Sequence, residues 1–177
     1  MPLRRSWIRM LSLSLALGPV ASGGESSKSE TPSSSFKAKV SGAESFEARG
    51  KDPRSTAGRR KLTGSATGER LVVQLRTAPS EESFGLVFGI DVTGRAPDAE
   101  VGSYPLQPLD AVGQWIRGGT DSEFYSEKGT LEVKESNESH LRGTFDVSGK
   151  CGKRREDCRI EGEFDLRREK PSSARPG

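Results

Sequence analysis

Apolar and polar residues alternate along most of this chain, which is the period of a β-strand with one face in a core and the other in water. The alternation is clearest from Tyr125 to Leu166, where three apolar sets recur at every second position between polar turns. The sets are Leu131 and Val133, then Leu141, Phe145 and Val147, then Ile160, Phe164 and Leu166. We predict a three-stranded antiparallel meander over this stretch.

Further strand patterns precede the meander. They lie at 36–40 and 46–48, which a turn joins into a hairpin, and at 71–75, 84–92, 102–106 and around 115–116. In the 84–92 strand, Gly85 and Gly89 lie on the face opposite the apolar set and leave that face open. Glycines in a strand are typical of a β-bulge or of a place where another backbone approaches closely. The stretch from Gly50 to Gly68 is rich in Arg, Lys, Ser and Gly, and we interpret it as a long loop with room for a short strand near Leu62.

The number and spacing of these segments indicate the fold class. No segment of ten or more residues has convincing helical spacing. About eight or nine short strands with turn signals between them are typical of an all-β domain. The chain is therefore predicted to form a single antiparallel β-sandwich or a calycin-like barrel.

Cys151 and Cys158 are the only cysteines, one on each side of the last turn of the meander. Both continue the inward-facing set of their strand, so the alternation predicts a structural disulfide across this hairpin. The alternative is a redox or metal-binding pair. A gap of six residues is not a C-x-x-C motif, and no second pair of ligands accompanies the two cysteines.

The cysteines also suggest how the last two strands pair. If they lie directly opposite each other, Phe145 falls opposite Phe164 and Val147 opposite Gly162. One register then satisfies both the core pattern and the bridge, and we predict that register.

The first 23 residues have the layout of a secretory signal peptide. Three arginines precede a short apolar run from Met10 to Leu17, and the small residues Ala21-Ser22-Gly23 follow. The run is far shorter than the ~20 residues that cross a bilayer, and no Cys follows to carry a lipid. We expect cleavage near Gly23 and export to the periplasm or the exterior, without a membrane span or a lipid anchor. The arginine pair at positions 4 and 5 leaves the general and twin-arginine routes open.

Composition divides the rest of the chain. Residues 24–35 are polar and Ser-rich and predict a flexible leader, 36–166 form the β domain, and 167–177 predict a disordered tail. The formal charge of +3 falls to neutrality once the first 23 residues, with three arginines and no acids, are removed. The basic runs at 59–61 and 153–155 are interpreted as solvated loops. A nucleic-acid partner is therefore not expected.

Sequence motifs for catalysis are missing. No nucleophile elbow, HExxH, Walker or GxGxxG pattern occurs, so we assign no catalytic residue, cofactor or metal site. The only histidine, His140, lies by a turn and should point to solvent, opposite to Leu141. Acids such as Asp121 and Glu123 have no distinguishing context, but they leave a carbohydrate hydrolase open as an alternative. The glycosylation sequon at 137–139 is interpreted as a chance match.

Four aromatic residues fall close together between prolines and glycines: Tyr104, Trp115, Phe124 and Tyr125. If they are exposed, they form a stacking surface for a sugar or a peptide, and they are our candidates for ligand contact. If they are buried, they close one end of the core.

Short sequences at the start of the domain, in its middle and in the meander carry a resemblance to known proteins. The domain begins Phe36-Lys-Ala-Lys-Val-Ser-Gly42, the middle holds Gly102-Ser-Tyr-Pro-Leu106, and the meander holds Gly129-Thr-Leu-x-Val133 and Gly143-Thr-Phe-x-Val147. Together they resemble a group of uncharacterised exported bacterial proteins, many of them lipoproteins. The resemblance implies a small β-sandwich or calycin-like barrel and implies no activity, because the group has no agreed one. This chain lacks the acceptor Cys of the lipidated members.

The sequence thus predicts an exported, non-enzymatic β-sandwich protein with a binding or cell-envelope-associated role, whose partner is a protein or a carbohydrate. One alternative is a calycin-like carrier of a small apolar ligand, which requires the 84–92 strand to line a cavity. The other is a carbohydrate-active hydrolase whose carboxylates the sequence does not identify.

Overall fold

The computed structural model describes residues 34–52, 54–62, 68–80 and 82–168. These residues form ten β-strands, one short 3-10 helix and no α-helix, so the predicted all-β class is confirmed. The elements are β1 (Ser35–Gly42), β2 (Phe46–Gly50), β3 (Thr56–Leu62), β4 (Gly68–Arg76), β5 (Ser83–Asp91), η1 (Pro97–Glu100), β6 (Gly102–Leu106), β7 (Ala111–Arg117), β8 (Thr120–Ser136), β9 (His140–Cys151) and β10 (Glu156–Arg167).

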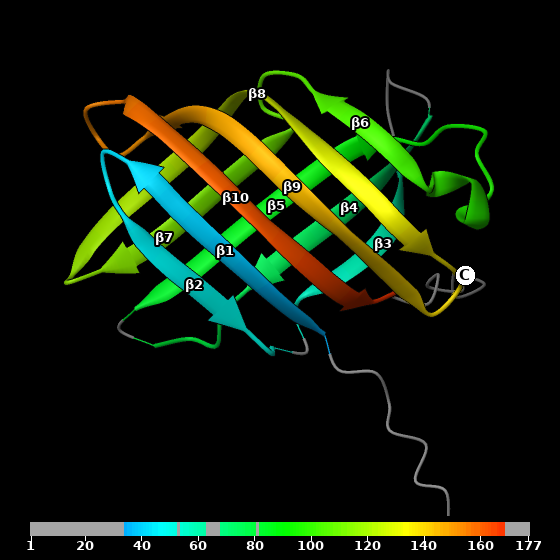
Figure 1. Cartoon of the computed structure of the whole chain (residues 1–177), viewed down its shortest axis with the longest axis horizontal. Helices are drawn as coiled ribbons and strands as arrows, with labels where there is room; N and C mark the ends of the chain where they lie inside the picture. The colour runs from blue at the N-terminus through cyan, green and yellow to red at the C-terminus, as the bar shows by residue number, and fades with distance from the viewer. Residues whose placement is uncertain (1–33, 53, 63–67, 81, 169–177) are drawn as a thin grey trace, which may run out of the picture.

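The ten strands form one antiparallel sheet that curls on itself. Their order is β2-β1-β10-β9-β8-β7-β5-β4-β3, and β6 pairs with β8 beside this path. In Figure 1, β1, β10 and β9 cross in front of β5, β4 and β3. Side chains join the two layers, since the ring centroids of Phe36 and Phe84 lie 5.8 Å apart and those of Phe88 and Phe145 lie 5.1 Å apart. The architecture fits a half-open barrel or a sandwich.

The longest strand, β8, organises the middle of the sheet. It pairs with β9 along one side, while its other side pairs first with β7 and then with β6. It begins at Thr120, five residues before the predicted start of the meander. The two-residue turn before it, Gly118–Gly119, has φ values of 54° and 74°. Glycine suits such a tight hairpin because it adopts positive φ without steric cost.

The long loop predicted at 50–68 is interrupted by β3, an edge strand beside β4. The strand ends at Leu62, where the sequence left room for a short strand, but it already begins at Thr56. Its inward position is the small residue Ala57, and Arg60 and Lys61 are exposed. Charged residues are common on edge strands because they discourage pairing with other chains. The same residues remove the apolar alternation by which a strand is recognised.

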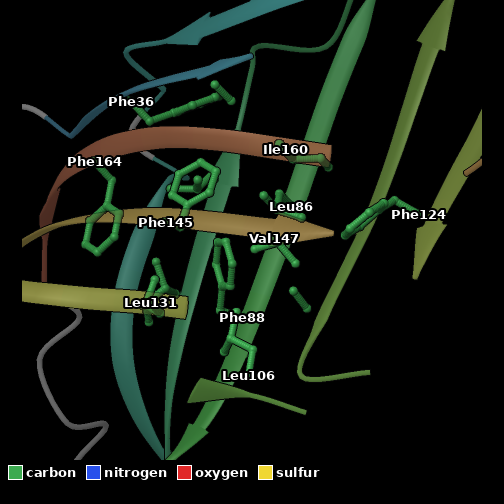
Figure 2. Packing of buried hydrophobic residues seen from close by; sticks show 14 of the residues in the cluster. Phe36, Leu86, Phe88, Leu106, Phe124, Leu131, Phe145, Val147, Ile160 and Phe164 are labelled. Carbon is green, nitrogen blue, oxygen red and sulfur yellow. The ribbon is translucent and has the colours of Figure 1, made fainter. Parts of the chain in front are cut away.

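The inward positions of the other strands fill the interior with large side chains. Figure 2 shows Phe88 of β5 and Phe145 of β9 pointing toward each other, with Leu131 and Leu86 nearby. The largest fully buried side chains are Trp115, Phe88, Phe124, Phe164, Leu71, Leu75, Leu86, Leu131, Leu141, Ile160, Leu166 and Glu100. The curled sheet is therefore packed with its own residues.

The predicted disulfide pair is present and faces inward. Cys151 and Cys158 are both buried and lie at disulfide distance, with their Cα atoms 5.7 Å apart. The predicted register of the hairpin is wrong by two residues, because Cys151 pairs with Glu156 and Cys158 with Gly149. The bridge therefore runs diagonally, between two residue pairs that lie two positions apart along the strands, rather than straight across.

Glycines opposite the phenylalanines explain this shift. Phe145 lies opposite Gly162, and Phe164 lies opposite Gly143. A Cβ atom added to Gly162 would lie 2.6 Å from Cζ of Phe145, and one added to Gly143 would lie 2.7 Å from Cζ of Phe164. Each ring therefore occupies the space that a side chain would take. A shift of two residues keeps the same residues inside, so the alternation alone could not distinguish the two registers.

Replacing both cysteines by serine is expected to lower the free energy of unfolding by about 2.5 kcal/mol, because the bridge closes a loop of about eight residues. Urea denaturation of the oxidised protein and of the double variant would measure the difference. A thiol count on denatured, unreduced protein should find none. Two reactive thiols in that count would contradict the bridge.

The ends of the domain extend slightly beyond the predicted range of 36–166. Ser34 and Arg168 are both buried, and the Ser34 hydroxyl accepts a hydrogen bond from the backbone N–H of Arg167. The predicted signal peptide, nearly all of the leader and residues 169–177 of the tail lie outside the described residues. In the part of the chain that the structure describes, no helix is long and apolar enough to cross a membrane.

Candidate functional site

His140 begins β9 and lies on the outer face of the sheet, opposite in direction to Leu141 as predicted. It is less exposed than expected, because its side chain is only one-fifth exposed and Nε2 contacts Oδ1 of Asp165 on β10. The neighbouring Ser139 hydroxyl donates to Asn137 at 3.0 Å. The histidine thus forms a cross-strand polar pair, with the adjacent hydroxyl directed elsewhere.

Three of the four candidate aromatic residues are part of the core. Tyr104, Trp115 and Phe124 are buried, so their rings are not exposed for a stacking ligand. The Tyr104 hydroxyl donates to the backbone carbonyl of Glu100 at 2.6 Å, and the Trp115 indole N–H donates to Glu44 at 2.8 Å. Each buried polar atom thus has a partner, as burial requires. Tyr125 alone of the four lies on the outer face, half-buried.

A buried ionic cluster surrounds Glu100 at the end of η1. The Glu100 carboxylate is fully buried and contacts the guanidinium groups of Arg168 and Arg59, the latter with Nε at 2.7 Å. Ser136 also donates to it, at 3.1 Å. The cluster lies where β3 meets the end of β10, next to a bridge between Ala57 and Arg168. Arg59 also pairs with Glu69 of β4 at 3.0 Å, so two cations and two carboxylates close the curled sheet at this point.

A groove on the outer face of β4, β5, β7 and β8 has the features of a binding site. One cross-strand row runs from Arg76 through Gly85 and Gln114 to Glu123. Gly85 carries no side chain, so the row is hollow at its centre. The groove, which we call the Gly85 groove, has a volume of about 730 Å³, and its lining includes Thr77, Pro79, Ser80 and Ser83.

Apolar side chains form the walls of the Gly85 groove. Val87, Val112 and Tyr125 make a second cross-strand row beside the hollow, and Ile116 lies on its other side, opposite Ser83. Val112 is 38% exposed and Ile116 is 37% exposed. Large apolar residues at that exposure on an outer sheet face mark a candidate contact surface.

The two ends of the groove differ in their charged groups. At one end the Arg76 guanidinium is exposed and forms no hydrogen bond or ion pair with the described residues, while the neighbouring Arg54 is engaged by Asp52 through Nε and Nη2. The Arg54 hydrogen bonds lower the pKa of the Asp52 carboxyl. Arg76 therefore remains available for a ligand.

Tyr125 and its neighbours make up the other end. The Tyr125 hydroxyl donates to Glu123 at 2.7 Å, and this hydrogen bond, with the carboxylate charge, raises the pKa of Tyr125. The Arg155 guanidinium lies 5.8 Å from the centroid of the Tyr125 ring. Gln114 donates to Asp121 at 3.1 Å. The two acids that left a hydrolase open thus each have a separate partner.

Among these groove residues, Tyr125 and Glu123 were considered as site candidates from the sequence, and Gly85 was expected to leave its face open. Nothing local in the sequence connects Arg76 with Gln114, because the two meet only through strand pairing. Within the described residues, no group of three or more His, Cys, Asp or Glu side chains is placed to hold a metal ion.

Comparison with protein-family models, with curated proteins and with solved structures finds no significant match.

Proposed function

We propose that this chain is an exported, non-enzymatic binding protein that takes its ligand in the Gly85 groove. One observation carries the proposal: exposed aliphatic residues and an arginine without an ion-pair partner among the described residues surround a glycine floor on an outer sheet face. A ligand site combines apolar walls with a few polar groups in this way.

Two features support a location outside the cytoplasm. The first 23 residues have the pattern of a signal peptide. The buried Cys151–Cys158 pair is of the kind that persists in oxidising compartments. Both features are independent of the groove.

The packing of the interior favours an outer site over the calycin-like carrier. Phe88 and Phe145 meet across the centre of the curled sheet, and Phe36 stacks on Phe84 nearer one end. A carrier would keep this space for its ligand. Here the same space is occupied by side chains of the chain itself, whereas the Gly85 groove is open.

A matched pair of glycine variants tests the groove. Gly85 and Gly89 both face outward from β5, but only Gly85 lines the groove. An added Cβ meets only ordinary contacts at either position, at 3.6 Å from the Gln114 carbonyl oxygen and at 3.4 Å from the Arg70 side chain. Gly85→Val should therefore fill the groove while the fold is kept, and Gly89→Val is its control.

We expect Gly85→Val to reduce ligand capture at least tenfold and Gly89→Val to leave it unchanged. The natural chain and both variants would be immobilised and exposed to native envelope and extracellular fractions, and the captured protein and carbohydrate would each be quantified. Equal capture by the two variants, or no capture by the natural chain, would contradict the proposal.

A further inference from the structure

If the Gly85 groove is the binding site, as proposed above, its charges and shape point to a class of ligand. We propose that the ligand is an acidic oligosaccharide, with one of its carboxylates held by Arg76 and one of its sugar rings packed against Tyr125.

The carboxylate is inferred from Arg76. A guanidinium group presents planar, paired donors that match the two oxygens of a carboxylate. Arg54 pairs with Asp52 in this way at the same end of the groove. Arg76 lines the groove and makes no ion pair with the described residues; its charge also lowers the pKa of the nearby Asp52 carboxyl, but that carboxylate is bound by Arg54. An acidic group on the ligand would supply it.

The sugar is inferred from the position of the groove on a sheet face. The backbone groups of β5 and β7 pair with each other beneath it, so a peptide cannot add there as a further strand. Recognition depends on side chains instead. Val112 and Tyr125 offer apolar surface, while Gln114 and Glu123 offer an amide and a carboxylate. A sugar ring has both a C–H face for the former and hydroxyl groups for the latter.

The length of the ligand follows from the strand spacing. Arg76 on β4 and Tyr125 on β8 are separated by three strand intervals, through β5 and β7. At ~4.8 Å an interval this is about 14 Å, which is more than one sugar ring and within a short oligosaccharide. At the far end, Lys150 lies opposite Tyr125 but is engaged by Asp157 at 2.6 Å, and Arg155 lies over the Tyr125 ring beside the carboxylate of Glu123. The charges therefore assign the ligand carboxylate to the Arg76 end.

Trisaccharide probes test this inference. The full chain would be titrated with trigalacturonate, with triglucuronate and with neutral maltotriose, following backbone amide shifts by NMR and heats by calorimetry. At least one acidic trimer should bind, with shift changes centred on Gly85, Val112 and Gln114. Maltotriose should bind at least tenfold more weakly.

Two variants separate specific recognition from general charge attraction. Arg76→Gln should weaken binding of the acidic trimer about tenfold or more, because a charge-assisted hydrogen bond is lost. Arg142→Gln removes an exposed arginine from the outer face of β9 and should leave affinity unchanged. An equal loss in both variants would overturn the role of Arg76.

The outcomes also separate this inference from the proposed function. If neither acidic trimer binds, or if maltotriose binds as well as they do and Arg76→Gln has no effect, the acidic-sugar inference is wrong. If a peptide from the captured material shifts the same groove resonances instead, the inference fails while the groove remains the binding site. The capture experiment with Gly85→Val is separate, because it tests whether the groove binds a ligand and not which class of ligand it binds.

Discussion

Replacing Glu100 by alanine is expected to lower the free energy of unfolding by about 3 to 5 kcal/mol, since it leaves buried positive charge without its partner. Glu100 is fully buried and holds Arg168, itself buried, together with Arg59. Without the carboxylate, the buried Arg168 loses its ion-pair partner among the described residues, whereas Arg59 keeps Glu69. Urea denaturation followed by circular dichroism would measure the loss.

An exposed ion pair provides the control. Glu47 and Arg49 lie on the edge strand β2 and form a surface pair with N–O distance 2.9 Å. Glu47→Ala should change stability little, because water screens such pairs. A second comparison combines Glu100→Ala with Arg168→Leu, which should recover part of the lost stability because one buried charge is removed. A small effect of Glu100→Ala would show that the cluster does not close the sheet.

Gly143→Ala is expected to destabilise the protein by about 3 kcal/mol, because the new methyl group has no room. The added Cβ would overlap the backbone carbonyl oxygen of Glu132 on β8 and lie 2.7 Å from Cζ of Phe164. The backbone of the paired strand cannot move aside without breaking hydrogen bonds. Thermal unfolding and urea denaturation would both report the change.

Gly85→Ala is the matched control for this substitution. It also lies within a strand, but an added Cβ is 3.6 Å from its nearest neighbour, the carbonyl oxygen of Gln114. Alanine there should stabilise the fold by about 0.5 kcal/mol, since glycine loses more backbone freedom on folding. If Gly85→Ala destabilised the protein as much as Gly143→Ala, the loss of stability could not be attributed to the close packing of Phe164 over Gly143.

The alternation of the sequence predicted which side of most strands faces the core, and therefore the fold class and the inward direction of both cysteines. It could not predict strand pairing in detail. A shift of two residues between β9 and β10 keeps Phe145 and Phe164 inside, so the choice depends on the glycines opposite them. The alternation also did not predict most of β3, because charged residues occupy the exposed positions of this edge strand.

The candidate site was less predictable than the fold. Tyr104, Trp115 and Phe124 look like Tyr125 in the sequence, and only the strand direction and the neighbouring layer decide which rings are buried. The Gly85 groove joins residues of four strands in cross-strand rows. Such rows have no local sequence signature, because their members become neighbours only when the sheet pairs.

The central position of β10 also affects how the chain can acquire its fold. In the sheet, β10 lies between β9 and β1, so the first strand of the domain pairs with the last. During synthesis, β1 and β2 leave the ribosome long before that partner exists, and an isolated hairpin is at best marginally stable in water. The β8–β10 segment pairs through short turns and closes at small entropic cost. The native sheet is therefore completed only when the end of the domain has been made, and the unit that folds is the whole domain rather than a leading part of it.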